Sequence, residues 1–262
     1  HVLTEARMAR DVAEARQMLA ASREHPECVT QIVPSPLGLA HDSAVENLIA
    51  DGFVGDIREV VVVAADAMFR DEKQPLHWRQ DREISGVNML ALGIFHETLT
   101  RWVPHPTTVF AQASLFEPDR APGINNREAA TVPDSLQILT TIPNGHGGSQ
   151  VGRGLYQMSG IALHGPRKQI HIYGSEGTIK LFFGAEEELW IGSRTDQELK
   201  RVTLPESERG GWRVEAEFIG AIRGEEQVRF TDFETGVRYM EFTEAVSTSA
   251  VTGSRISIRD DV

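Results

Sequence analysis

Cysteine, positive charge and long apolar runs are scarce in this sequence. Its 262 residues include one cysteine, Cys28, so no disulfide can form within the chain. Lys and Arg number 26 against 38 Asp and Glu, and the resulting net charge of −12 argues against a nucleic-acid partner. No run of about 18 apolar residues occurs, so we expect no helix that crosses a membrane. A single thiol fits the reducing cytoplasm, where we expect the protein to act.

Two ligand-binding signatures are also missing. The histidines show neither a His-x-His nor a His-x-x-x-His spacing, and cysteine pairs are impossible, so we predict no metal site. No Gly-x-Gly-x-x-Gly opens a helix after a strand, so the sequence carries no recognisable loop for a nucleotide pyrophosphate.

The first 53 residues alternate short strands with amphipathic helices. Asp11 is a good N-cap for one helix, and Gly52 is a stop signal for the other. The predicted elements are strands at 2–4 and 29–33, a helix at 12–24, and a helix that Asp42 or Ser43 caps and that runs through Ala50. This alternation is typical of a doubly wound α/β domain, so residues 1–53 are interpreted as the C-terminal part of one.

Residues 54–262 have a different pattern, dominated by strands. The β-branched run Val60–Val63 predicts a buried strand, residues 117–131 predict an exposed loop, and Asn144–Gly145 predicts a hairpin turn. The predicted strands are 57–65, 107–115, 136–142, 149–156, 161–163, 168–173, 178–183, 189–191, 199–204 and 255–259, and the helices are 85–102, 212–223 and 235–252. The pattern favours an α+β domain with one large, mostly antiparallel sheet.

The segment Ser85–Trp102 is the longest nearly apolar stretch of the chain. Apolar residues recur in it at helical spacing, which predicts one mostly buried helix over the whole segment. Gly93 falls inside this helix, where a glycine indicates that something packs close to the backbone. His96 lies between Leu92 and Leu99 on the same side.

Several of these segments together resemble the glucose-fructose oxidoreductase/inositol dehydrogenase (Gfo/Idh/MocA) family. The resemblance rests on residues 1–9, on Trp78–Arg79, on Ser85–His96, on the turn Gly174–Gly177 and on the closing helices. It covers essentially the whole chain. It implies an NAD- or NADP-dependent oxidoreductase that acts on a sugar, polyol or related alcohol or carbonyl. It also implies that the pyrophosphate loop belongs to an earlier βαβ portion, so we expect this chain to be a fragment and to bind the nucleotide poorly.

The chain departs from the family at the residues that handle protons. The family's catalytic Lys falls on Ala6 and its neighbouring Pro on Arg7, while the helix Asp and His fall on Ala91 and Phe95. His96 follows one residue later, about 100° further around the helix. We predict that His96 takes over the catalytic role, against the alternative of an ordinary core histidine.

Four residues are predicted to bind the cofactor by the same resemblance. Glu5 lies at the end of a strand where such folds bind ligands, and Arg7 suits charge stabilisation or carboxylate binding rather than proton abstraction. Trp78 and Arg79 match a family pair beside the nicotinamide, although a packed Trp with a surface Arg is the alternative. Asn88 and Glu97 are further candidates to line the cleft.

Three functions therefore remain open from the sequence. The first is the oxidoreductase with a carbohydrate-like substrate. The second is a non-catalytic relative that binds a ligand or regulates, since fold alone does not determine function. The third is a structural oligomerisation module. In each case we expect a homo-oligomer through the open face of the large sheet.

Overall fold

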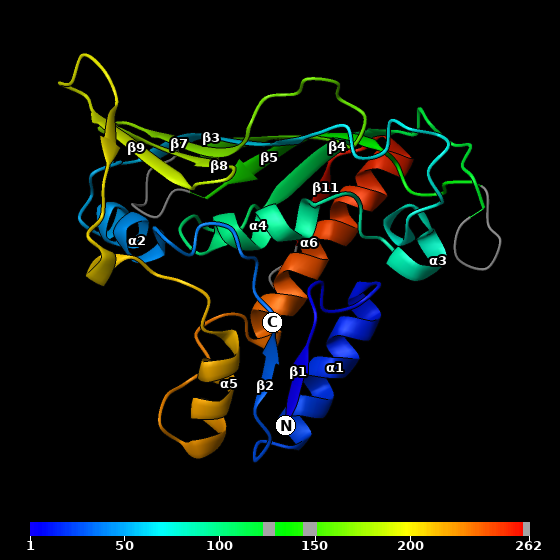
Figure 1. The fold of residues 1–262 in the computed structure, drawn as a ribbon, viewed down its shortest axis with the longest axis horizontal. Helices are drawn as coiled ribbons and strands as arrows, with labels where there is room; N and C mark the ends of the chain where they lie inside the picture. Colours follow the sequence, from blue (N-terminus) through cyan, green and yellow to red (C-terminus); the bar gives the residue numbers. More distant parts are fainter. Residues whose placement is uncertain (123–128, 144–150, 259–262) are drawn as a thin grey trace.

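The computed structural model describes residues 1–122, 129–143 and 151–258. These residues form a large sheet with helices on one face and a smaller α/β part beneath the helices (Figure 1). The strands are β1 (Val2–Thr4), β2 (Thr30–Ile32), β3 (Ile57–Ala65), β4 (Thr108–Ser114), β5 (Ser135–Ile142), β6 (Gly152–Ser159), β7 (Lys168–Gly174), β8 (Gly177–Phe183), β9 (Glu188–Ser193), β10 (Lys200–Val202) and β11 (Ile256–Ser257). The helices are α1 (Val12–Glu24), α2 (Asp42–Ala50), α3 (Arg82–Ser85), α4 (Leu92–Thr100), α5 (Val214–Arg223) and α6 (Phe233–Thr252), with 3-10 turns η1 (Trp78–Gln80) and η3 (Glu206–Glu208).

The large sheet has the strand order β10-β9-β8-β7-β3-β6-β5-β4-β11. All neighbouring pairs are antiparallel except β3 and β6, which run parallel. The expected α+β domain with a mostly antiparallel sheet is therefore confirmed. Val60 and Val62 of β3 are almost fully buried, because this strand has a partner on each side and helices below it.

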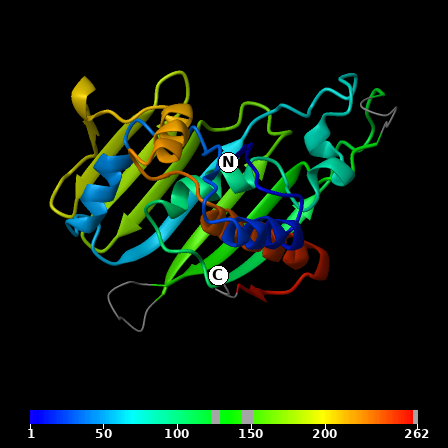
Figure 2. The same ribbon diagram turned by 90° about the horizontal axis from the view of Figure 1, so that it is seen from below.

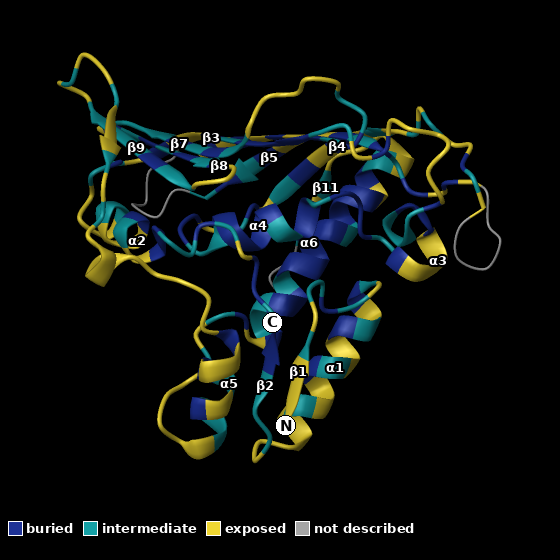
Figure 3. Ribbon diagram, viewed as in Figure 1, coloured by how far each residue is buried: buried dark blue, intermediate teal, exposed yellow. Residues whose placement is uncertain are grey.

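One face of the sheet is covered and the other is open. Residues of β5 and β6 alternate between buried and exposed, as expected for strands with a single packed face. The helices α2, α4 and α6 lie on the packed side, and the buried residues concentrate there (Figure 3). No helix of the described chain lies on the opposite side (Figure 1).

The smaller part has its own core and shares α6 with the large one. Its strands β1 and β2 pair in parallel, as expected for part of a doubly wound domain, and α1 runs beside α6 (Figures 1 and 2). Val237 and Met240 from the first half of α6 pack into this core, whereas Phe242 and Val246 belong to the large core. Helix α6 thus contributes to both cores.

The helix predicted at 85–102 is shorter than expected. Helix α4 covers only Leu92–Thr100, while Ser85 is the last residue of α3, which ends at Gly86 with a φ of 62°. A Cβ on Gly86 would lie 2.0 Å from the backbone oxygen of Arg10, so no other residue fits there. The segment before Leu92 is held by contacts with residues 9 and 10, which a local periodicity does not reveal.

Other expectations also need correction. Residues 161–163 form no strand. Strand β6 runs over Gly152–Ser159, whereas 149–156 is expected from the sequence, and residues 149 and 150 of that range lie outside the described residues. The expected hairpin turn at Asn144–Gly145 lies outside the described residues. In the described part of the 117–131 loop, Arg120 is buried and donates to the carbonyls of Phe69 and Asp71, so that part is not freely exposed. No helix in the described part of the chain is long and apolar enough to cross a bilayer.

Candidate functional site

The loop after β1 lies directly on the segment that precedes α4. The backbone N–H of Val87 donates to Arg10 O at 2.8 Å, and Asn88 Nδ2 donates to Ala9 O at 2.9 Å. The backbone N–H of Met8 donates to the hydroxyl of Tyr239 on α6. These bonds fix the position of the loop at the carboxyl end of β1, the end where doubly wound folds bind their ligands.

Arg7 is held inside this contact with very few partners. Its Cδ lies 2.6 Å from where a Cβ on Gly93 would be, which explains the glycine inside α4. Its Nη1 makes one long bond of 3.4 Å to Leu90 O, and its Nε is buried without a hydrogen-bond partner. Burial lowers the pKa of Arg7 to about 10, with a further contribution from the charge of Arg79.

Trp78 and Arg79 form the second half of this site. They lie on η1, where the side chain of His77 caps the turn by accepting the N–H of Arg79. The Arg79 guanidinium carbon lies 4.1 Å from the centre of the Trp78 ring, a cation–π contact. Burial lowers the pKa of Arg79 as well. We call Arg7, Trp78 and Arg79 the arginine cluster.

The arginine cluster lacks a counter-ion within the described residues. Neither Arg7 nor Arg79 forms an ion pair with any described carboxylate. The charged neighbour that acts on Arg7 is another arginine, and Tyr239 is the one group that opposes its effect. Two cations close together, with donors unused, are chemically suited to an anionic or carbonyl-bearing ligand.

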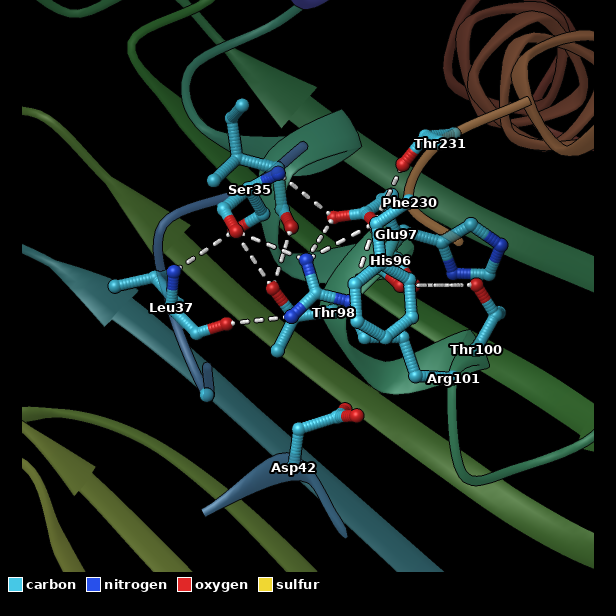
Figure 4. Close-up of polar contacts among 12 residues, drawn as sticks. Ser35, Leu37, Asp42, His96, Glu97, Thr98, Thr100, Arg101, Phe230 and Thr231 are labelled. Atoms are coloured by element: carbon cyan, nitrogen blue, oxygen red, sulfur yellow. Dashed lines mark hydrogen bonds and ion pairs between the residues drawn. The ribbon is translucent and has the colours of Figure 1, made fainter. Parts of the chain in front are cut away.

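A different polar network lies beside this site, on the far end of α4. Arg101 Nη2 donates to Glu97 Oε2 at 2.8 Å, and the two side chains are only 4% and 6% exposed. Glu97 also accepts from Ser35 N at 3.0 Å and from Thr231 Oγ1 at 2.9 Å (Figure 4). The network therefore ties the loop after β2 and the segment before α6 to the same helix, and every bond in it is internal to the protein.

His96 belongs to the core in this structure. It is 0% exposed, its Nδ1 lies 2.9 Å from the Tyr156 hydroxyl, and its ring stacks on Phe242 at a centroid distance of 3.6 Å. Burial, followed by the charge of nearby His105, lowers its pKa well below 6.5, so the ring is neutral. None of these contacts is with the arginine cluster.

Of the remaining residues predicted from the sequence, some lie in the site and others lie outside it. Glu5 is exposed next to β1, whereas Arg7, Trp78 and Arg79 are brought together. Asn88 supports the loop rather than facing open space. Of the positions where the family has its proton-handling groups, Phe95 packs edge-on against Phe183 at 5.9 Å, and Ala6 packs against the small core. No described group of three or more His, Cys, Asp and Glu side chains could hold a metal ion.

Sequence reasoning missed two contributors. Tyr239 reaches the loop from 231 residues away along the chain, so no local pattern could indicate it. Arg101 could have been found, because Glu97 and Arg101 stand at i and i+4 on an apolar helix, a spacing that favours an ion pair.

Comparison with known proteins places this chain in a family. The model of the GFO/IDH/MocA C-terminal domain matches residues 43–180, more than half of the chain. The chain belongs to the Gfo/Idh/MocA family. A search of curated proteins found no significant match.

Solved structures agree with this family fold. The oxidoreductase domain protein from Kribbella flavida matches with a TM-score of 0.85 and 20% identity, covering 99% of this chain and 74% of that one. Levoglucosan dehydrogenase in complex with NADH matches with a TM-score of 0.83 and 20% identity, covering 99% and 73%. The NAD binding oxidoreductase from Klebsiella pneumoniae gives 0.82 and 18%, covering 100% and 74%. At these identities the likeness establishes the fold of this Gfo/Idh/MocA chain.

Proposed function

We propose that this chain is the substrate-handling part of an NAD- or NADP-dependent oxidoreductase that acts on a sugar, polyol or related alcohol or carbonyl. Membership of the Gfo/Idh/MocA family supports the proposal, as do the relatives solved with NADH, one of them also with levoglucosan. The observation that carries it is the arginine cluster, because partnerless donors at the carboxyl end of β1 stand where such folds bind ligands.

The residues present fit the nicotinamide end of such a cofactor. When bound, the cofactor supplies the ring that accepts or donates a hydride. Trp78 and Arg79 offer a flat stacked pair on which a planar ring can pack. We propose that Glu5, Arg7, Trp78 and Arg79 line this end of the cofactor. We propose that residues 1–53 belong to a nucleotide-binding α/β domain and that residues 54–262 are the substrate domain.

Oxidation of an alcohol also requires a group that removes the hydroxyl proton. Arg7 holds its proton at neutral pH, since its pKa is lowered only to about 10, and its role is therefore binding. Ala6, Ala91 and Phe95 have no proton to exchange. The catalytic role proposed for His96 requires its ring to leave Tyr156 and Phe242 when substrate binds.

A non-catalytic ligand-binding relative is the second candidate function. Two observations favour it. The residue types that handle protons are absent at Ala6, Ala91 and Phe95, and His96 of α4 is packed in the core. In this case the arginine cluster would still bind a ligand, without hydride transfer. A cytoplasmic location is retained as a prediction for both functions.

The assay that separates the two follows NADH or NADPH absorbance at 340 nm. The 262-residue chain and any longer product of the same gene are tested in parallel with a panel of sugars, sugar acids and polyols. Turnover that is reduced by about 10-fold or more in Arg79→Gln and unchanged in Arg10→Gln is the expected result. Ligand binding without turnover on any panel member would favour the non-catalytic function.

We further propose that the open face of the sheet forms a homo-oligomer. Phe110, Leu139 and Leu155 are all exposed, and the strand register places them side by side across β4, β5 and β6. Leu139, in the middle of this row, is 56% exposed. A contiguous apolar row on a sheet face is more typical of an interface than of a free surface. A second copy of the chain would cover it by the same row.

A further inference from the structure

We propose that the arginine cluster binds a carboxylate, so that the substrate is an acid such as a sugar acid rather than a neutral sugar. This inference rests on the proposed function and adds the substrate class to it. The group recognised is a single carboxylate, held by Arg7 from the β1 loop and by Arg79 from η1. The remainder of the substrate would extend from there toward the nicotinamide end of the cofactor.

The first argument is that Arg7 makes fewer hydrogen bonds than an arginine with a structural role. A buried guanidinium that supports structure normally saturates its donors with carbonyls or carboxylates, as Arg101 does with Glu97 and with the carbonyls of residues 35 and 37. Arg7 instead makes one 3.4 Å bond and leaves a buried Nε empty. Leaving a buried donor without a partner destabilises the fold, so the missing acceptor is expected to come from a ligand.

The second argument is the charge of the surroundings. Arg79 lies near enough for its charge to oppose that of Arg7, and no described carboxylate neutralises either. A neutral sugar hydroxyl could fill a hydrogen bond but would leave this repulsion in place. An anion removes it, and the planar fork of an arginine matches the two oxygens of a carboxylate.

The test is calorimetric titration of the purified chain without any cofactor. D-Glucuronate and D-gluconate are the anionic probes, and methyl D-glucuronate ester and D-glucitol are their neutral counterparts at equal ionic strength. Inorganic phosphate is titrated as well. We expect at least one acid to bind about 10-fold or more tightly than its neutral counterpart, as charge-assisted hydrogen bonds allow. Phosphate should bind more weakly than that acid.

Three variants make the test specific. Arg7→Gln and Arg79→Gln should each remove the preference for the acid, while Arg10→Gln, an exposed arginine of the same loop that already pairs with Glu14, should keep it. Thermal melting checks that each variant is folded. If Arg7→Gln does not fold, Arg79→Gln alone provides the test. Equal binding of the acids and their neutral counterparts, or an intact preference in the Arg79 variant, would overturn the inference. Preferential phosphate binding would reassign the cluster to the nucleotide.

The outcome is independent of the hydride-transfer assay. If turnover is found on neutral substrates and no acid preference appears, only the carboxylate inference fails. If acids bind through both arginines and no turnover is found, the proposed oxidoreductase function fails and the anion site stands.

Discussion

Glu97 and Arg101 form an ion pair one turn apart on α4, with both side chains more than nine-tenths buried and 2.8 Å between Oε2 and Nη2. Arg101 donates in addition to the carbonyls of Ser35 and Leu37, and Glu97 accepts from Thr231. Arg101 also lies over the Phe230 ring at 4.7 Å. The pair thus joins three chain segments at the junction between the small part and the sheet. Gly93, in the first turn of the same helix, packs against Arg7, an arginine that has no carboxylate partner among the described residues.

The Glu97→Gln substitution should strongly destabilise the protein. The charge of Arg101 would then remain buried without its carboxylate, which typically costs about 3–5 kcal/mol of unfolding free energy. Chemical denaturation measures the change. The matched control is Glu59→Gln, which removes an exposed pair with Arg153 and should leave stability nearly unchanged. A loss for Glu97→Gln no larger than that of the control would show that the network does not hold the junction.

The Arg7→Met substitution should have the opposite sign and stabilise the chain. Methionine fills similar space and removes a partly desolvated cation and its repulsion with Arg79, so we expect a gain of roughly 1 kcal/mol in unfolding free energy. This corresponds to a rise of about 2–4 °C in Tm for a chain of this size. Differential scanning calorimetry checks it. A clear fall in Tm would mean that Arg7 supports the fold and that its donors are satisfied in solution.

The neutral, buried state of His96 predicts a specific pH dependence of stability. Its folded pKa is lowered below the unfolded value of about 6.5, so the unfolded chain binds more protons at low pH. Stability should therefore fall as pH drops below about 6.5. His171, whose pKa burial lowers to about 4, should contribute a similar but smaller loss between those two values, because it is half-exposed.

Replacing His96 with Gln should reduce this loss between pH 7.5 and pH 5, measured by denaturation at each pH. An unchanged slope would indicate that His96 is not buried in solution. Turnover of the same variant tests its proposed catalytic role, which predicts a fall of about 10²-fold or more. Normal turnover would leave His96 as a core residue.

The Leu139→Lys substitution should break the proposed oligomer. It places a charge in the centre of the exposed row formed with Phe110 and Leu155. Sedimentation at roughly tens of micromolar protein should shift from a multiple of the chain mass to a single chain. The control is Val251→Lys, at the end of α6, a position that is more exposed and outside the row. A wild-type chain that sediments as a clean monomer would contradict the proposal.

The sequence was a good guide wherever the signal is local. The helix at 12–24 begins and ends as predicted, because Asp11 caps it and His25–Pro26 stops it without help from elsewhere. The segment before Leu92 was predicted helical and is not, since Val87 and Asn88 hydrogen-bond to a loop almost 80 residues away along the chain. Such long-range partners override local periodicity.

The site shows the same division. Motif position predicts that Arg7, Trp78 and Arg79 bind the cofactor, and the structure places the Arg79 guanidinium over the Trp78 ring with its charge close enough to act on Arg7. That Arg7 has no carboxylate partner among the described residues could not be predicted, because it depends on the positions of all the carboxylates in the folded chain. The orientation of the His96 side chain could not be predicted from the sequence either. It is set by contacts with Tyr156 and Phe242, which come from a strand and a helix far along the chain.

The most direct test of the oxidoreductase proposal is the change in absorbance at 340 nm when the full-length gene product is mixed with NAD⁺ or NADP⁺ and the substrate panel. We predict turnover on at least one member, greatest for a sugar acid, reduced by about 10-fold or more in Arg79→Gln and unchanged in Arg10→Gln. The 262-residue chain, which lacks a recognisable pyrophosphate loop, should show weak nucleotide binding and no turnover. A folded full-length product that binds the nucleotide and yet converts no sugar, sugar acid or polyol in either direction would contradict the proposal.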